Sequence, residues 1–333
     1  MPRMSRPLLA LSLCGLFACT APRASAPAAS TPAAQPGPLP GAGTPAAIPS
    51  SIAFVSLEGP LWVAAQHALL FSDVVEKNAP GAAIYRFDPS TRSFSQLPYP
   101  DAPGTPTSTN GLGLDASGAL LACERYNGRL VKIAANGTRA VLADRWPLGA
   151  GGAPLNAPND LVVRGDGNIY FTDTDWGARE GVAHAPTAVY RVPPNGPVQQ
   201  VLAMTKPNGI ALSPDGTALY VGSDTQAKLW KLPVDPSGTA GAPALFIDGA
   251  AVAGGFKVPD GICVDDTGAL YVANNADDVK AIIAFDPAGH QLGRIPLPVA
   301  PSNCTFGGDD RKTLYVTTLH AIYEVPMPTA GLP

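Results

Sequence analysis

The sequence has few charged residues, no run of lysine or arginine, and no long apolar run. Charged side chains make up 14% of the 333 residues, and the formal net charge is −4. Because a nucleic-acid-binding surface needs clustered basic residues, this composition excludes a nucleic-acid partner. The one N-terminal apolar run, residues 8–17, is too short for a stable membrane-spanning helix. We therefore expect no transmembrane segment.

Two kinds of chemical site are also missing. The chain has no G-x-S-x-G motif, which argues against a serine hydrolase with a nucleophile elbow. Its five cysteines have scattered spacings that form neither a zinc site nor a disulfide framework. We expect buried free thiols at Cys123, Cys263 and Cys304. Cys263 and Cys304 fall on neighbouring predicted strands, however, where a bridge can form.

The first 19 residues have the pattern of a bacterial lipoprotein leader. Arg3 and Arg6 precede the apolar run, which ends in Leu-Phe-Ala-Cys at Cys19. The alternative is an ordinary signal peptide cut in the Ala-rich stretch beyond. We expect a lipid on Cys19, which would be the only membrane contact. The protein would then lie in the bacterial cell envelope, on the periplasmic side of the outer membrane or another extracytoplasmic face.

Residues 20–50 consist almost entirely of Ala, Pro, Ser, Thr and Gly. This composition has little to bury, so it predicts a disordered tether. We expect the folded domain to span residues 51–333.

The feature that the sequence has in abundance is a repeat. In the clearest copies a polar residue is followed by a short apolar strand, a turn that contains Asp and Gly, and a second apolar strand, as in VPDGICVDDTGALYVAN at residues 258–274. The copies that begin at Glu58 and Asn303 are degenerate. The polar residues that begin the six copies lie 43 to 52 residues apart: Glu58, Asn110, Asn159, Asn208, Asp260 and Asn303. A period of this size, built from hairpins, is typical of a β-propeller with one four-stranded blade per repeat. The sequence therefore predicts an all-β, six-bladed propeller.

The two ends of the repeat array suggest how the ring closes. The last copy stops soon after its third strand, whereas a strand-like segment, SIAFVS at residues 51–56, precedes the first copy. We expect this N-terminal strand to complete the sixth blade, because closure removes the exposed edges of an open array. A closed propeller of this kind is expected to be monomeric.

The six polar residues point to a metal site. The first strand of each propeller blade lines the central channel, so equivalent residues form a ring around the axis. This ring holds two carboxylates, Glu58 and Asp260, and four amides. Oxygen donors with two negative charges suit a hard divalent cation such as Ca²⁺. The alternative is that Asn-Gly and Asp-Gly pairs merely shape turns.

Several motifs resemble the gluconolactonase/regucalcin (senescence marker protein) family. They are EGPLW from Glu58, LNAPND from Leu155, YFTD from Tyr170, PNGI from Pro207, PDGI from Pro259 and SNCTFGG from Ser302. The similarity spans residues 52–325 with the motifs in the family's order. It implies one divalent cation in the channel, Ca²⁺ first and Zn²⁺, Mg²⁺ or Mn²⁺ as alternatives. The implied ligands are Glu58, Asn208 and Asp260, with Asn159 as a further ligand or a substrate-binding amide.

The resemblance also implies a reaction, the metal-dependent hydrolysis of a small lactone, most simply a sugar lactone. Asp260 falls where the family places a carboxylate that binds metal and serves as base or nucleophile. We expect Asn110, Asn159, Asp173, Trp176 and Arg125 to contact the substrate. Two alternatives use the same site: a lipid-anchored binding scaffold with a structural metal, and a phosphotriester or phosphofluoridate hydrolase.

The resemblance is incomplete at two positions that we expect to face the substrate. Arg125 stands where bacterial relatives often carry the histidine of a Cys-Glu-His sequence, and Ala157 stands where animal members carry an arginine. These departures concern the substrate rather than the metal.

Overall fold

The computed structural model describes residues 37–74, 83–97, 108–147, 149 and 151–332. Every described residue belongs to one compact unit. The predicted leader, the lipidation site Cys19 and tether residues 20–36 lie outside the described residues, so they stay predictions. Within the described ranges, no helix has the length and apolar character needed to cross a membrane.

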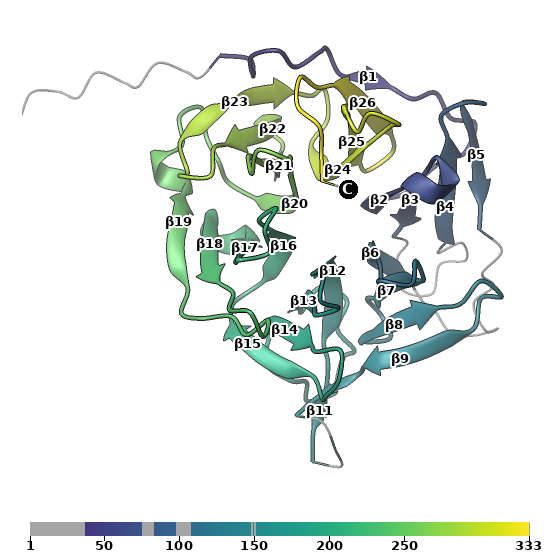
Figure 1. Ribbon diagram of the computed structural model, residues 1–333, viewed down its shortest axis with the longest axis vertical. Helices are drawn as coiled ribbons and strands as arrows, with labels where there is room; N and C mark the ends of the chain where they lie inside the picture. The colour runs from purple at the N-terminus through teal and green to yellow at the C-terminus, as the bar shows by residue number, and fades with distance from the viewer. Residues whose placement is uncertain (1–36, 75–82, 98–107, 148, 150, 333) are drawn as a thin grey trace, which may run out of the picture. The chain divides into compact units, whose positions relative to one another are not determined.

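The described residues form six four-stranded antiparallel sheets set around a common centre as blades (Figure 1). The innermost strand of each blade contacts the innermost strands of both neighbouring blades, and the last of them contacts the first. The ring is therefore closed. The prediction of an all-β, six-bladed propeller is confirmed.

The first three blades follow the chain in order, each with its innermost strand first. Blade 1 consists of β2 (Leu57–Val63), β3 (Ala68–Asp73), β4 (Ala83–Asp88) and β5 (Ser93–Gln96). Blade 2 consists of β6 (Thr109–Leu114), β7 (Leu120–Glu124), β8 (Arg129–Ile133) and β9 (Arg139–Ala143). Blade 3 consists of β12 (Ala157–Val163), β13 (Ile169–Thr174), β14 (Ala188–Val192) and β15 (Gln199–Ala203).

The last three blades close the ring. Blade 4 consists of β16 (Pro207–Leu212), β17 (Ala218–Ser223), β18 (Lys228–Pro233) and β19 (Ala244–Asp248). Blade 5 consists of β20 (Pro259–Val264), β21 (Leu270–Ala276), β22 (Val279–Phe285) and β23 (Gln291–Pro296). Blade 6 consists of β24 (Pro301–Gly307), β25 (Thr313–Thr318), β26 (Ile322–Pro326) and β1 (Ala46–Ala47).

A few short elements lie outside the blades. The strands β10 (Arg145–Trp146) and β11 (Ala153–Pro154) pair with each other between blades 2 and 3. The described residues also contain three single-turn 3₁₀ helices: η1 (Ala64–Gln66), η2 (Asp224–Gln226) and η3 (Gly249–Ala251).

The D-x-x-G turns join the first two strands of the repeats. In blade 5 the Asp265 carboxylate accepts hydrogen bonds from the backbone N–H groups of Thr267 and Ala269, at 2.9 Å each. Gly268 then takes a left-handed φ of +85°, which a residue with a side chain rarely adopts. The aspartate and the glycine therefore specify the turn, and the turn sets the register of the two strands.

Each innermost strand is irregular beside its polar residue. The register of β2 against β3 shifts between Glu58 and Leu61, and the same kind of shift occurs in the other five blades. A bulge of this kind re-aims a side chain. The strands also approach closely here: a Cβ added to Gly209 would lie 2.0 Å from the carbonyl oxygen of Asp260. The repeat thus turns one polar residue per blade toward the same level of the ring.

The apolar core lies between the blades. One buried cluster joins Ile282 of blade 5 to Phe306 of blade 6, and another joins Leu121 of blade 2 to Phe171 of blade 3. Each blade therefore buries its faces against two neighbours, which holds the innermost strands at fixed distances from one another.

The closing strand differs from the one that the sequence predicts. An N-terminal strand does complete blade 6, but it is β1, which pairs Ala46 with Glu324 and Ala47 with Tyr323. Residues 51–56 contain no strand. The backbone N–H groups of Val55 and Ser56 donate instead to the Asp73 carboxylate, at 3.0 and 2.9 Å.

Residues 37–50 also differ from the predicted tether. Leu39 is 8% exposed and packs into the core between blades 5 and 6, and its N–H donates to the carbonyl oxygen of Arg294 at 2.9 Å. Ile48 is 3% exposed, and its N–H donates to the carbonyl oxygen of Ile322 at 2.8 Å. These two apolar side chains, set among Ala, Pro and Gly, are enough to anchor the segment.

The expectation of free thiols is wrong for two of the three cysteines in the propeller. Cys263 on β20 and Cys304 on β24 form a disulfide, whereas Cys123 is a buried free thiol. The physical reason is the close approach of neighbouring innermost strands, which brings the two Cα atoms to 5.8 Å, within the range that a disulfide spans.

Candidate functional site

The six polar residues that begin the repeats lie at one level of the channel, and we call them the polar layer. They are Glu58, Asn110, Asn159, Asn208, Asp260 and Asn303. We call the end of the ring where the innermost strands start the upper end, and the end with the D-x-x-G turns the lower end. Glu58 is partly exposed, and the other five side chains are at most 9% exposed. The layer is thus a nearly buried set of oxygen donors.

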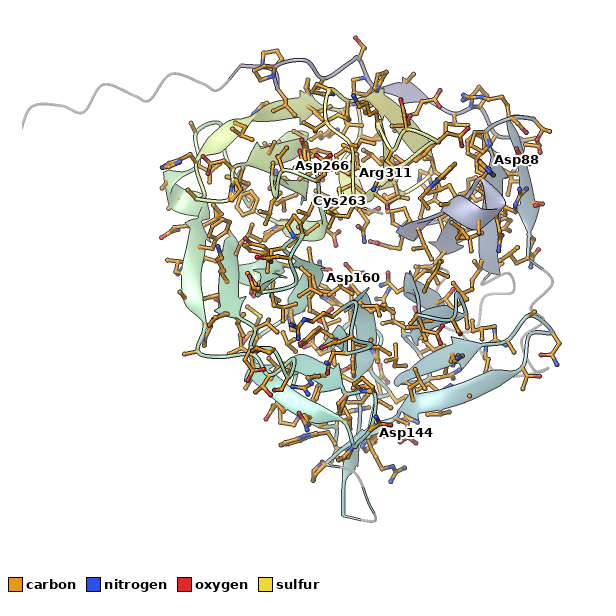
Figure 2. The ribbon with its side chains drawn as sticks, viewed as in Figure 1. Asp88, Asp144, Asp160, Cys263, Asp266 and Arg311 are labelled. Atoms are coloured by element: carbon orange, nitrogen blue, oxygen red, sulfur yellow. A yellow bond between two sulfur atoms is a disulfide. The ribbon has the colours of Figure 1, made fainter. Side chains whose placement is uncertain are left out.

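One residue of the site escaped the sequence analysis. Asp160 follows Asn159 on β12, where four of the other five repeats have glycine. Its side chain is 8% exposed and lies toward the centre of the ring (Figure 2). Asp160 accepts hydrogen bonds from the N–H groups of Leu161 at 2.9 Å and Ile210 at 3.4 Å. The break in the Asn-Gly pattern was the available signal.

Three carboxylates therefore share a small, poorly solvated space. Burial, together with the charges of Asp260 and Asp160, holds the pKa of Glu58 well above its usual range. Burial raises the pKa of Asp260 to about 7, with Asp160 and Asp224 adding to the rise. Burial raises the pKa of Asp160 to about 6. The three groups resist ionising together unless a positive charge compensates them.

Amide side chains hold these carboxylates from the outside. Asn275 Nδ2 donates to Asp260 Oδ2 at 2.8 Å, and the nearby Asn208 side chain partly offsets the rise in the pKa of Asp260. Asn303 Nδ2 donates to Glu58 Oε2 at 3.3 Å, and the Asn303 side chain partly offsets the rise in the pKa of Asp160. The structure therefore brings together Glu58, Asn208 and Asp260 of the predicted set. Asn275 and Asn303 take supporting positions.

The donor set has the chemistry of a site for a hard cation. In the described ranges no group of three or more His, Cys, Asp or Glu side chains lies at metal-binding spacing. The polar layer is a different combination, because it joins two carboxylates to four amides, and amides do not belong to such a group. Carboxylate and amide oxygens are ligands that Ca²⁺ and Mg²⁺ prefer, and a divalent charge would offset the repulsion between the acids. Of the predicted ligands Glu58, Asn159, Asn208 and Asp260, the structure brings Glu58, Asn208 and Asp260 close to one another, and the cation itself stays a prediction.

Asp173, predicted to bind substrate, has a different position. It is fully buried at the upper end of β13, where its two oxygens accept bonds from Asn156 N, Asn156 Nδ2 and Ala157 N at 2.8 to 2.9 Å. In the same way, Asp73 accepts hydrogen bonds from backbone N–H groups of the chain before β2, and Asn274 accepts them from the chain before β20. This position anchors the segment that leads into an innermost strand.

Trp176 and Arg125 lie near each other at the upper end. Arg125 Nε donates to the carbonyl oxygen of Trp176 at 2.7 Å, which joins blade 2 to the loop after β13. Lys206, just before β16, places its Nζ 5.0 Å from the Trp176 ring centroid and 3.5 Å from Asp175 Oδ1. The loop therefore spans from blade 2 to the start of blade 4 at the same end as the polar layer.

Below the polar layer the channel opens into a cavity of 1010 Å³. Its inner end is lined by Asp160 and Asn303, and Asp215 and Asp309 lie among the turn residues at its lower end. Each blade adds an apolar side chain to its wall: Leu61, Leu112, Leu161, Ile210, Ile262 and Phe306. The lower channel is thus mainly apolar in its walls, unlike the layer above it.

Comparison with known proteins agrees with this geometry. Residues 57–320 match the family described as "SMP-30/Gluconolactonase/LRE-like region". The chain belongs to this family. The match begins beside Glu58 and runs through all six repeats, so it includes the whole polar layer.

Individual members of the SMP-30/gluconolactonase family show the same similarity. A gluconolactonase from Zymomonas mobilis is 30% identical over 298 residues, which covers 82% of this chain and 79% of the relative. A 6-deoxy-6-sulfogluconolactonase from Pseudomonas putida is 28% identical over 267 residues, covering 78% and 82%. The solved structure of a gluconolactonase from Xanthomonas campestris has a TM-score of 0.70 at 29% identity, covering 90% of this chain and 99% of that one.

Proposed function

We propose that this protein is a metal-dependent hydrolase of sugar lactones, with one divalent cation, Ca²⁺ first, in the polar layer. Two observations support the proposal: the relatives are named for lactone hydrolysis, and the chain matches them over most of its length. The observation that carries it is the convergence of Glu58, Asp160 and Asp260, where the charges of Asp160 and Asp260 raise the pKa of Glu58 and the charge of Asp160 raises the pKa of Asp260. A stable fold gains nothing from such repulsion, so we infer that the arrangement serves a ligand.

The chemistry follows from what each side chain can do. A divalent cation held by Glu58, Asn208 and Asp260 would supply Lewis-acid chemistry, which would polarise the lactone carbonyl and offset charge on its oxygen. Asp260, the carboxylate that we assign as base, takes a proton from the attacking water. Asn275 fixes the orientation of that carboxylate through its 2.8 Å bond to Oδ2. The Asn159 and Asn110 amides, on the neighbouring innermost strands, orient the lactone.

The upper end also suggests a preference among lactones. Arg125 uses Nε to hold the Trp176 carbonyl oxygen, and its terminal nitrogens form no hydrogen bond with another residue in the described part of the chain. A guanidinium with free terminal nitrogens binds carboxylate or sulfonate groups well. We therefore propose that the enzyme accepts sugar lactones with an anionic substituent at least as readily as neutral ones.

A lactone panel tests this function. The metal-stripped protein would be assayed on neutral and acidic sugar lactones, with EDTA and with added Ca²⁺, Zn²⁺, Mg²⁺ or Mn²⁺. We expect hydrolysis only with a divalent cation, and a lower KM for the acidic lactone. If metal changes only the melting temperature and no lactone is hydrolysed, the protein is a binding scaffold. Hydrolysis of phosphotriesters but not lactones would also contradict the proposal.

We further propose that the protein is exported and lipid-anchored through Cys19. The Cys263–Cys304 disulfide supports export, because structural disulfides persist mainly in oxidising compartments. Fractionation of cells that carry Cys19→Ser tests the anchor. We expect the variant to leave the membrane fraction, and an equally membrane-bound variant would contradict a lipid on Cys19.

A further inference from the structure

The Cys263–Cys304 disulfide lies directly beside the polar layer. Cys263 is three residues after Asp260 on β20, and Cys304 immediately follows Asn303 on β24. The bond joins the innermost strands of blades 5 and 6 across a sequence separation of 41 residues. Both cysteines also line the lower cavity. The disulfide is therefore three residues from Asp260 on one strand and one residue from Asn303 on the other.

Asn303 connects this link to the carboxylates. Its Nδ2 donates to Glu58 Oε2 at 3.3 Å, and its Oδ1 accepts from the Cys304 N–H at 2.8 Å. A Cβ placed on Gly261 would lie only 2.0 Å from Asn303 Oδ1, so the Asn303 side chain packs on the β20 backbone directly after Asp260. A movement of β24 along β20 would therefore shift Asn303 relative to both Glu58 and Asp260.

Blade 6 has weaker support on its outer side than the other blades. Its outermost strand, β1, has two residues, whereas the outermost strands of the other blades have four to six. The Cys304 Sγ also lies 3.4 Å from the Tyr271 carbonyl oxygen of blade 5. The disulfide thus holds the innermost strand of the most thinly completed blade against its neighbour.

We propose that the Cys263–Cys304 disulfide is a positioning element of the polar layer, which keeps Asn303 and Asp260 in register for cation binding. This inference rests on the proposed function, because it concerns the affinity of that site. Reduction by a dithiol breaks the S–S bond and forms two S–H groups, while the dithiol loses two electrons and two protons and becomes a cyclic disulfide. The cavity beside both cysteines gives a small dithiol a route to the bond.

A disulfide with a purely structural role would behave differently. Its loss would lower the free energy of unfolding, because the unfolded chain would gain conformational freedom. It would leave the affinity of the folded protein for a cation unchanged. Cation affinity, measured well below the melting temperature, therefore separates the two roles.

The experiment uses the double variant Cys263→Ala/Cys304→Ala and the matched control Cys123→Ala. Cys123 is a buried free thiol on β7, so its change removes a cysteine without touching the link. Each protein would be stripped of metal and titrated with Ca²⁺ by calorimetry, and the wild type would be titrated again after dithiothreitol treatment. Thiol titration of the denatured protein would verify two additional thiols.

We expect Ca²⁺ binding to weaken about 10-fold in the double variant and in the reduced wild type, a loss typical of groups that support metal ligands. Cys123→Ala should bind as the wild type does. Unchanged affinity in the folded double variant would overturn the positioning role alone. A wild type that binds no divalent cation would overturn both the proposed function and this inference, so the two failures are distinguishable.

Discussion

The upper and lower halves of the channel are built by the same six strands and differ in chemistry. At the upper end each strand begins with a polar residue beside a bulge, and three nearly buried carboxylates meet there. At the lower end the same strands carry aliphatic and aromatic side chains around a 1010 Å³ cavity. The polar layer, rather than the cavity wall, carries the groups that we propose to bind a cation and move a proton.

The position of a residue along its innermost strand therefore decides whether its side chain joins the polar layer or the apolar wall of the channel. Regular alternation would send every second side chain of a strand to the channel. The bulge interrupts that alternation beside Glu58 and Asp260 and re-aims them. Substitutions at the two ends of the innermost strands should therefore have unequal effects.

The largest effect should come from Asp260→Asn. The change keeps the size of the side chain but removes a charge and the base, so we expect turnover to fall at least about 100-fold even at saturating metal. The matched control is Asp309→Asn, which makes the same change at the lower mouth of the channel. Initial rates on a sugar lactone compare the two, and equal rates would contradict the comparison.

Asn275→Ala should have the next largest effect. Asn275 lies behind Asp260 and donates to its Oδ2, so its loss leaves the carboxylate free to rotate. We expect cation affinity to fall about 10- to 100-fold, whereas turnover at saturating metal stays near the wild-type value. Calorimetric titration beside saturated rates separates these two quantities. A lowered saturated rate with unchanged affinity would give Asn275 a direct part in the chemistry.

Arg125→Gln should act on the substrate alone. We expect a KM increase of about 10-fold for an acidic lactone, from the loss of one charge-assisted hydrogen bond, and little change for a neutral one. Steady-state kinetics on both substrates give the measurement. An equal increase for both lactones would show that Arg125 supports the Trp176 loop rather than an anionic group.

The pH dependence of stability should be the smallest effect. The raised pKa values of Asp260, about 7, and Asp160, about 6, mean that the folded protein takes up protons in a range where the unfolded chain does not. The metal-free protein should therefore become more stable as pH falls from 8 toward 5, by about 2–4 °C in Tm for each kcal/mol gained. Scanning calorimetry measures this. Saturating Ca²⁺ should remove the trend, since it compensates the ionised groups at high pH.

The repeat made most of the fold predictable. A polar residue followed by a hairpin recurs at a nearly constant period, so blade number and the polar layer follow from the pattern alone. The closing strand did not follow, because two alanines at β1 carry no alternation that marks a strand. The disulfide could not be predicted from the repeat, because the repeat does not give the distance between Cys263 and Cys304 on neighbouring strands.

Side-chain direction also explains two features of the site that the motifs do not show. Asp160 occupies a position where the equivalent residue of most repeats is glycine, so the motif alone does not mark its carboxylate as part of the site. Asp173 is equivalent in the repeat to Asp73 and Asn274, and all three side chains anchor the chain before an innermost strand. Aligning the six repeats and comparing equivalent positions shows both features: a carboxylate where glycine is usual, and an Asp or Asn side chain that anchors the chain before an innermost strand.

The most direct test of the account is equilibrium dialysis of the metal-stripped protein against Ca²⁺, with the bound metal counted by mass spectrometry. The account predicts one cation per chain in the wild type and in Asp309→Asn, and none in Asp260→Asn at the same free Ca²⁺ concentration. A wild type without bound cation, or Asp260→Asn with a full complement, would contradict the assignment of the cation to the polar layer.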